Sequence, residues 1–109
     1  MIDGNEMDRD LARLRDAIDR VDEVLVKLLN QRAKYAIEIG QVKGVLGMDF
    51  YLPAREKEVL ANVEKNSNGP LGPTAVRRLF ERIIDESRRC EREAFGTESQ
   101  LGNEGENQT

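Results

Sequence analysis

The sequence predicts an all-α fold of three helices, one long, one short and one of medium length. Two observations indicate the helices: apolar residues recur at spacings of three and four, and glycines and prolines gather in two short segments, "GVLGMDFYL" and "NSNGPLGP", that separate the periodic stretches. A third concerns the core. The chain has 109 residues, of which 35% are charged and 5% aromatic, so we expect a small core that needs a partner.

The first helix is predicted from Met7 to about Leu46. No proline interrupts this segment, and Gly44 and Gly47 provide stop signals at its end. At 1.5 Å per residue the helix would extend about 60 Å, whereas a compact domain of this size has a radius of gyration near 13 Å. It would therefore overhang a monomeric globule. Its apolar stripe consists of Leu11, Leu14, Ile18, Val21, Leu25, Leu28, Ile39 and Val42.

The second helix is predicted from Pro53, which suits a first helical turn, to about Asn66. A third begins at Pro73 or Thr74 and ends near Phe95. Its inward face ends in two polar groups and comprises Val76, Leu79, Phe80, Ile83, Ile84, Ser87, Cys90 and Glu91.

These elements define an N-terminal segment (1–6), a helical domain (7–95) and a tail (96–109). The tail has a single leucine and no periodicity, so we expect it to be disordered.

Composition excludes several classes of function. A net charge of −4 argues against general nucleic-acid binding, and no apolar run is long enough to span a membrane. The N-terminus lacks the basic start and apolar core of a signal peptide, so we expect a cytoplasmic protein. There is no histidine and one cysteine, Cys90, which argues against imidazole triads and against a metal site. We expect Cys90 to be a small core residue.

Two cations, Arg32 and Lys43, lie on an otherwise apolar helix face. Eleven residues at about 100° each return to within about 20° of the starting direction, so both side chains point the same way. The alternative is two unrelated charges on a solvated stripe. Arg15 is 17 residues before Arg32, about 25 Å along the axis, which is too far for one small ligand. If Arg15 serves the same site, it must come from a second subunit whose long helix runs antiparallel.

Four stretches together resemble the all-helical AroQ class of chorismate mutases: "LRDAIDRVDEVLVKLLNQRAKYAIEIGQVKG", "FYLPAREKEVL", "NGPL" and "RRLFERIIDESRRCERE". The resemblance covers about Leu11 to Ala94 and is strongest to the mutase domain that begins bifunctional chorismate mutase/prephenate dehydratases. It implies an intertwined homodimer that rearranges chorismate to prephenate, in phenylalanine and tyrosine biosynthesis, without a cofactor.

The resemblance also assigns roles by position. Arg15 of the partner chain, Arg32 and Arg55 resemble the arginines that bind the two substrate carboxylates. Lys43 matches the cation on a carboxylate and the ether oxygen, Glu56 the partner of the ring hydroxyl, and Ser87 a carboxylate contact. Lys43, Glu91 and Arg32 are the predicted catalytic residues. The expected mechanism is conformational restraint with electrostatic stabilisation of the ether oxygen.

Two positions depart from the family pattern. Leu52 stands where some relatives have Asp, so one contact near the substrate hydroxyl is missing or comes from the backbone. Glu91 stands where relatives have Gln or Glu, and it can donate a hydrogen bond to the ether oxygen only when protonated. This predicts activity that rises toward acidic pH. The alternative is a surface Glu91 paired with Arg88.

Two other functions fit the same residues. Isochorismate pyruvate lyase shares the scaffold and a similar set of cations but eliminates pyruvate, although "FYLPAREKEVL" is more similar to the mutase. The other is a noncatalytic helical module for dimerisation or regulation. It would function without Arg32, Lys43 and Arg55.

Overall fold

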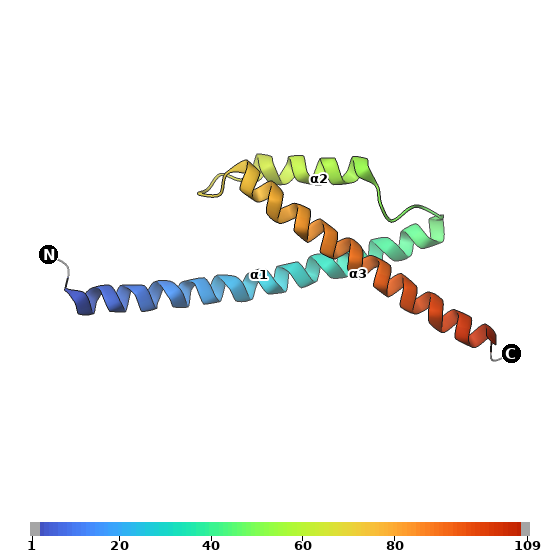
Figure 1. Cartoon of the computed structure of the whole chain (residues 1–109), viewed down its shortest axis with the longest axis horizontal. Coiled ribbons are helices and arrows are strands. Elements are labelled where there is room, and N and C mark those ends of the chain that lie inside the picture. The colour runs from blue at the N-terminus through green and yellow to red at the C-terminus, as the bar shows by residue number, and fades with distance from the viewer. Residues whose placement is uncertain (1–2, 108–109) are drawn as a thin grey trace. The chain divides into compact units, whose positions relative to one another are not determined.

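The described chain forms three α-helices: α1 (Gly4–Leu46), α2 (Pro53–Asn66) and α3 (Pro73–Asn107) (Figure 1). The computed structural model describes residues 3–107, with side chains described as far as residue 95, and it contains no strand in that range. The predicted all-α class and its three helices are thereby confirmed. None of the described helices is long and apolar enough to cross a membrane. The chain divides into two compact units, one of residues up to Gln31 and one of residues from Arg32 onward.

The first helix begins three residues earlier than the predicted start at Met7. Asp3 is the reason, because its side-chain Oδ1 accepts the Asn5 N–H (3.2 Å) and its carbonyl accepts the Met7 N–H (3.1 Å). An aspartate at this position satisfies donors that the first helical turn leaves free. The sequence carried this capping signal within the predicted N-terminal segment.

The end of α1 is a Schellman motif centred on Gly47. Gly47 has φ +69°, its N–H donates to the Gly44 carbonyl (3.3 Å), and the Met48 N–H donates to the Lys43 carbonyl (2.8 Å). Glycine adopts this left-handed conformation without the steric cost that a Cβ brings. The predicted stop signal at Gly47 is therefore correct, and it turns the chain into the loop that leads to α2.

Helices α2 and α3 form a hairpin around the small apolar core. Among the described side chains, Leu60 and Val76 are the large apolar ones that are buried, at 9% exposure each. Arg77 joins the two helices by an ion pair with Glu64 (3.2 Å). Leu79, predicted to face inward, is instead 53% exposed, because no other element of this unit covers it.

The C-terminal part of α1 crosses α3 at two glycines (Figure 1). Gly40 faces Glu91, and Gly44, one turn later, faces the ring of Phe95. Glu91 and Phe95 are likewise one turn apart on α3. The crossing therefore places two residues without side chains on one helix against two larger side chains on the other, which brings the helices close together.

The N-terminal part of α1, up to Gln31, exposes its apolar stripe along its whole length. Exposed fractions range from 47% to 59% for Leu11, Leu14, Ile18, Val21, Leu25 and Leu28. Soluble monomers rarely leave so long an apolar surface uncovered. This exposed stripe and the small core are consistent with the expectation that the chain needs a partner, which stays a prediction.

Helix α3 continues to Asn107, beyond the helix end predicted near Phe95. No proline occurs between residues 96 and 107, and adding a residue to an existing helix costs far less than starting one. The division into segments 1–6, 7–95 and a disordered tail stays a prediction. Residues 108 and 109 lie outside the described residues.

We expect Leu60→Ala to lower the free energy of unfolding by about 2–4 kcal/mol, because it leaves a cavity in the small core. Leu71→Ala is the matched control, since Leu71 is 53% exposed, and it should cost less than about 1 kcal/mol. Urea unfolding at one fixed protein concentration measures both. Equal losses in the two variants would contradict the assignment of the core.

Candidate active site

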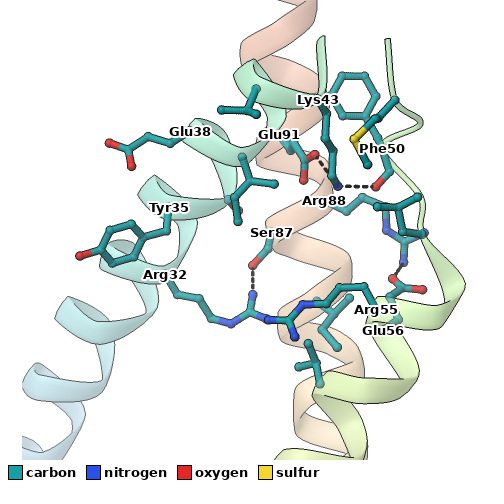
Figure 2. A pocket seen from close by; sticks show the side chains of 17 residues that line it. Arg32, Tyr35, Glu38, Lys43, Phe50, Arg55, Glu56, Ser87, Arg88 and Glu91 are labelled. Carbon is teal, nitrogen blue, oxygen red and sulfur yellow. Dashed lines mark hydrogen bonds and ion pairs between the residues drawn. The ribbon is translucent and has the colours of Figure 1, made fainter. Parts of the chain in front are cut away.

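A cavity of about 840 Å³ lies between the C-terminal part of α1, the loop after it, the start of α2 and the middle of α3 (Figure 2). Every predicted site residue from Arg32 onward lines it. These residues are Arg32, Lys43, Arg55, Glu56, Ser87 and Glu91. They come from three helices, so the fold brings together side chains that are as far as 59 positions apart in the sequence.

An ion pair between Lys43 and Glu91 closes one end of the cavity. The Nζ of Lys43 lies 3.1 Å from Oε1 of Glu91, and the two side chains are only 13% and 7% exposed. Nζ also donates to the Phe50 carbonyl (3.0 Å) (Figure 2). These two contacts use two of the three N–H groups of the ammonium. The third is available to a ligand.

The loop that supplies the Phe50 carbonyl is held in place from both sides. Its start follows from the turn at Gly47, and the ring of Phe50 packs edge-on against Phe95 of α3, with ring centroids 5.1 Å apart. Such aromatic pairs favour an edge-to-face arrangement. The loop therefore presents a fixed carbonyl to Lys43.

Two guanidinium groups face the opposite end of the cavity. Nη1 of Arg32 donates to Oγ of Ser87 (2.6 Å), and the Arg55 side chain lies nearby (Figure 2). Arg55 also forms an ion pair with Glu58 on its own helix. Burial and, secondly, the positive charge of Arg55 hold the pKa of Arg32 below its ordinary value. Arg32 hydrogen-bonds a neutral hydroxyl, so its charge is not compensated there. An anion at this end of the cavity would compensate the charge of Arg32.

Glu56 is held by an arginine that the sequence analysis did not place in the site. Nη2 of Arg88 lies 2.6 Å from Oε1 of Glu56 and 2.9 Å from Oδ1 of Asp85, and its guanidinium stacks 4.8 Å from the centre of the Tyr51 ring. Arg88 also lines the cavity. Its position beside Ser87 on α3 was the one available signal.

This arrangement contradicts the alternative in which Glu91 is a surface residue paired with Arg88. Glu91 is buried, at 6% exposure, and pairs with Lys43, whereas Arg88 pairs with Glu56 and Asp85. The two glutamates therefore each have a different cation. Which pairing forms depends on how α1 and α2 pack against α3, and spacing along α3 alone does not contain that information.

Apolar side chains form most of the remaining walls. They include Ala36, Ile39, Val42, Met48, Leu52, Val59 and Ile84. Leu52, which departs from the family pattern, is also the N-cap residue of α2 and gives that helix no side-chain cap. The first turn is instead started by Pro53, whose missing N–H would have had no helical partner.

Arg15 lies in the N-terminal part of α1 and does not line this cavity. It belongs to the unit that ends at Gln31 and is exposed there. Its predicted place in the site, through a partner chain, stays a prediction.

The sequence from residue 14 to residue 92 matches the family model described as "Chorismate mutase type II". The chain belongs to this family. The match includes most of α1, all of α2, the first part of α3 and all six cavity residues named above. The predicted resemblance to all-helical chorismate mutases is thus confirmed.

Known relatives agree with this assignment. The chain is 40% identical over 78 residues to the bifunctional chorismate mutase/prephenate dehydratase of Neisseria gonorrhoeae, which covers 72% of this chain and 21% of that protein. It thus spans about a fifth of the length of that curated relative. A chorismate mutase structure from Thermus thermophilus matches with a TM-score of 0.74 and 34% identity, covering 76% of this chain and 94% of that one. A Helicobacter pylori chorismate mutase in complex with prephenate matches with a TM-score of 0.73 and 27% identity, covering 79% and 93%.

We expect Arg32→Met to change the free energy of unfolding by no more than about 1 kcal/mol, because the lost hydrogen bond to Ser87 is offset by removal of a charge that burial and Arg55 disfavour. Succinate should raise the melting temperature of the unmodified protein and not that of the variant, with chloride at equal ionic strength as the blank. Arg77→Met removes an arginine outside the cavity and should keep the response to succinate. A response that survives in Arg32→Met would contradict an anion site here.

Proposed function

We propose that this chain is a chorismate mutase that converts chorismate to prephenate in the cytoplasm, for phenylalanine and tyrosine biosynthesis. The observation that carries the proposal is the cavity with the uncompensated guanidinium of Arg32 at one end and the Lys43–Glu91 pair at the other. Membership of the family supports it, and so does the Helicobacter pylori relative, whose structure contains prephenate.

The Arg32 and Arg55 guanidiniums bind the substrate carboxylates. Chorismate carries two carboxylates, a ring hydroxyl and an enolpyruvyl ether, and burying such a dianion without cations would be prohibitive. A guanidinium fork matches the two oxygens of a carboxylate, and Ser87 adds a hydroxyl beside Arg32. Holding both carboxylates imposes the compact conformer in which the reacting carbons approach one another.

Lys43 stabilises the charge that builds on the ether oxygen as its carbon–oxygen bond breaks. The ammonium is fixed by Glu91 and by the Phe50 carbonyl, so its remaining N–H is preorganised for that oxygen. Glu56 accepts a hydrogen bond from the ring hydroxyl, with Arg88 holding the carboxylate. The rearrangement is intramolecular and needs no nucleophile and no net proton transfer, which fits a chain without histidine.

The direct test is chorismate consumption by the purified protein without metal or cofactor, with prephenate identified as the product. We expect conversion, and its collapse in Arg32→Ala. A parallel incubation with isochorismate distinguishes the lyase, since release of pyruvate from isochorismate without prephenate from chorismate would replace the proposal. Conversion of neither substrate by the folded protein would favour a noncatalytic helical module.

Lys43→Ala should lower kcat by about a hundredfold or more, because losing one preorganised contact to a developing charge costs about 3–4 kcal/mol of barrier. Lys57→Ala is a matched control, since Lys57 is exposed on α2 and does not line the cavity. Its kcat should equal that of the unmodified protein. A Lys43→Ala variant with near-normal turnover would contradict the ether contact.

Glu91 holds Lys43 as a carboxylate and could donate to the ether oxygen only after taking up a proton, so direct donation by Glu91 would make activity rise toward acidic pH. Glu91→Gln always offers an N–H and should give a flat profile of kcat/KM between pH 5 and pH 8, a range of about three units around neutrality. If the profile is unchanged in Glu91→Gln, Glu91 does not donate to the substrate. It then acts only by holding Lys43.

We also propose that two copies of the chain form an intertwined dimer in which each site receives Arg15 from the partner. The exposed apolar stripe of the N-terminal part of α1 supports an interface, because a second copy would cover it. Arg15 lies on the same segment and would add a third guanidinium for the carboxylates. Among the described residues, Arg88 is the other arginine that lines the cavity, and it is already paired with Glu56 and Asp85.

Mixed dimers test the origin of Arg15. Arg15→Ala and Lys43→Ala should each be inactive alone, but unfolding and refolding them together in equal amounts should restore about a quarter of the activity, since about half of the dimers are mixed and each contains one intact site. Lys43→Ala mixed with Arg55→Ala is the control and should stay inactive, because both residues come from the same chain. No recovery in the first mixture would place Arg15 outside the partner's site.

A further inference from the structure

Gly40 is the buried residue of α1, and it lies against Glu91 of α3. A Cβ at position 40 would stand 2.4 Å from Cγ of Glu91, 3.3 Å from its Cδ and 3.4 Å from its Oε1. Carbon atoms in contact are normally about 3.5–4.0 Å apart. The side chain of Glu91 therefore occupies the space that any other residue at position 40 would fill.

Glu91 has little freedom to give way. The closest atom is Cγ, near the base of the side chain, so turning the carboxylate alone would not relieve the contact. Moving Cγ requires a change of χ1, which would carry Oε1 away from its position 3.1 Å from Nζ of Lys43. Glu91 is 6% exposed, so an alternative position in solvent is not close by.

We propose that Gly40 is a positioning residue for the Lys43–Glu91 pair. Without a side chain at position 40, Glu91 lies along the surface of α1, and its carboxylate reaches Lys43, which follows Gly40 by three residues on the same helix face. Figure 2 shows this carboxylate meeting the ammonium at the crossing of the two helices. The effect on turnover rests on the proposed mutase function.

A glycine at position 40 also lowers the stability of α1. A glycine inside a helix destabilises it by about 1 kcal/mol relative to alanine. At Gly40 the gain is the approach of a buried carboxylate to a buried ammonium, since a buried charge is tolerated when it is paired.

Gly44 provides a control within the same helix crossing. A Cβ there would lie 3.0 Å from Cε2 of the Phe95 ring, and neither residue lines the cavity. Gly44→Ala therefore disturbs the packing of α1 on α3 one turn away from Glu91. Because Phe95 packs on Phe50, whose carbonyl holds Lys43, the two glycines are distinguished by whether their effect depends on the Glu91 side chain.

The experiment is a double-mutant cycle of Gly40→Ala and Glu91→Ala, with kcat and KM measured for chorismate. Gly40→Ala should lower kcat by about ten- to hundredfold, as expected for a misplaced catalytic contact. In the Glu91→Ala background the same change should have no further effect, because Cγ is gone. Any loss of kcat that Gly44→Ala causes should be the same in the unmodified and Glu91→Ala backgrounds, because its contact is with Phe95 and not with Glu91.

Other outcomes overturn the proposal. A full additional loss in the Glu91→Ala background would mean that Gly40 serves helix packing, and an unchanged kcat in Gly40→Ala would mean that Glu91 does not need it. If Gly40→Ala alone does not fold, the double variant should fold, since the clash is absent; a double variant that also fails to fold contradicts the inference.

A structural readout keeps this inference separate from the proposed function. Crystal structures of the unmodified protein and of Gly40→Ala should differ in the Nζ–Oε1 contact between Lys43 and Glu91, which is 3.1 Å in the unmodified chain and should be broken in the variant. If chorismate is not converted but this contact breaks, the positioning role stands without the mutase. An intact contact in Gly40→Ala overturns the positioning role whatever the activity.

Discussion

The ion pair between Lys43 and Glu91 determines how the rest of the site is arranged. It joins α1 to α3 across a separation of 48 residues, with both side chains nearly buried. Removing two charges from water is costly unless they meet at hydrogen-bond distance, so the pair restricts the helices to registers in which these two residues are opposite each other. Gly40 makes the approach possible, and the Phe50 carbonyl ties the loop after α1 to the same ammonium.

The charges of the cavity divide into balanced and unbalanced groups. Glu91 balances Lys43, and Glu56 balances Arg88, so these pairs are stable without a ligand. Arg32 has only the Ser87 hydroxyl, and the nearby Arg55 adds to the effect of burial in lowering its pKa. The uncompensated charge is therefore concentrated at Arg32, at one end of the cavity. A dianion would compensate it there, which is how a binding site exchanges some stability for function.

The small core and the exposed stripe have one common cause, which is that a single copy of the chain buries little apolar surface. Leu60 and Val76 are the large apolar side chains that are buried in the described range, whereas the N-terminal part of α1 exposes six regularly spaced apolar residues. Hydrophobic burial is the main favourable term in folding. The proposed dimer would add to that term by covering the stripe, and it would place the stripe and Arg15 in the same interface.

The sequence by itself determined the helices and much of the membership of the site. The bounds of α2 at Pro53 and Asn66, the end of α1 near Gly47, and the shared direction of Arg32 and Lys43 all depend on local geometry, which repeats every 3.6 residues and is interrupted by proline and glycine. The tertiary structure decided which charges pair. Glu91 pairs with Lys43, and Arg88 pairs with Glu56. The missing side chain at Gly40 matters only because Glu91 lies against it. These contacts depend on the distance and register of two crossing helices, and no periodicity within either helix contains that information.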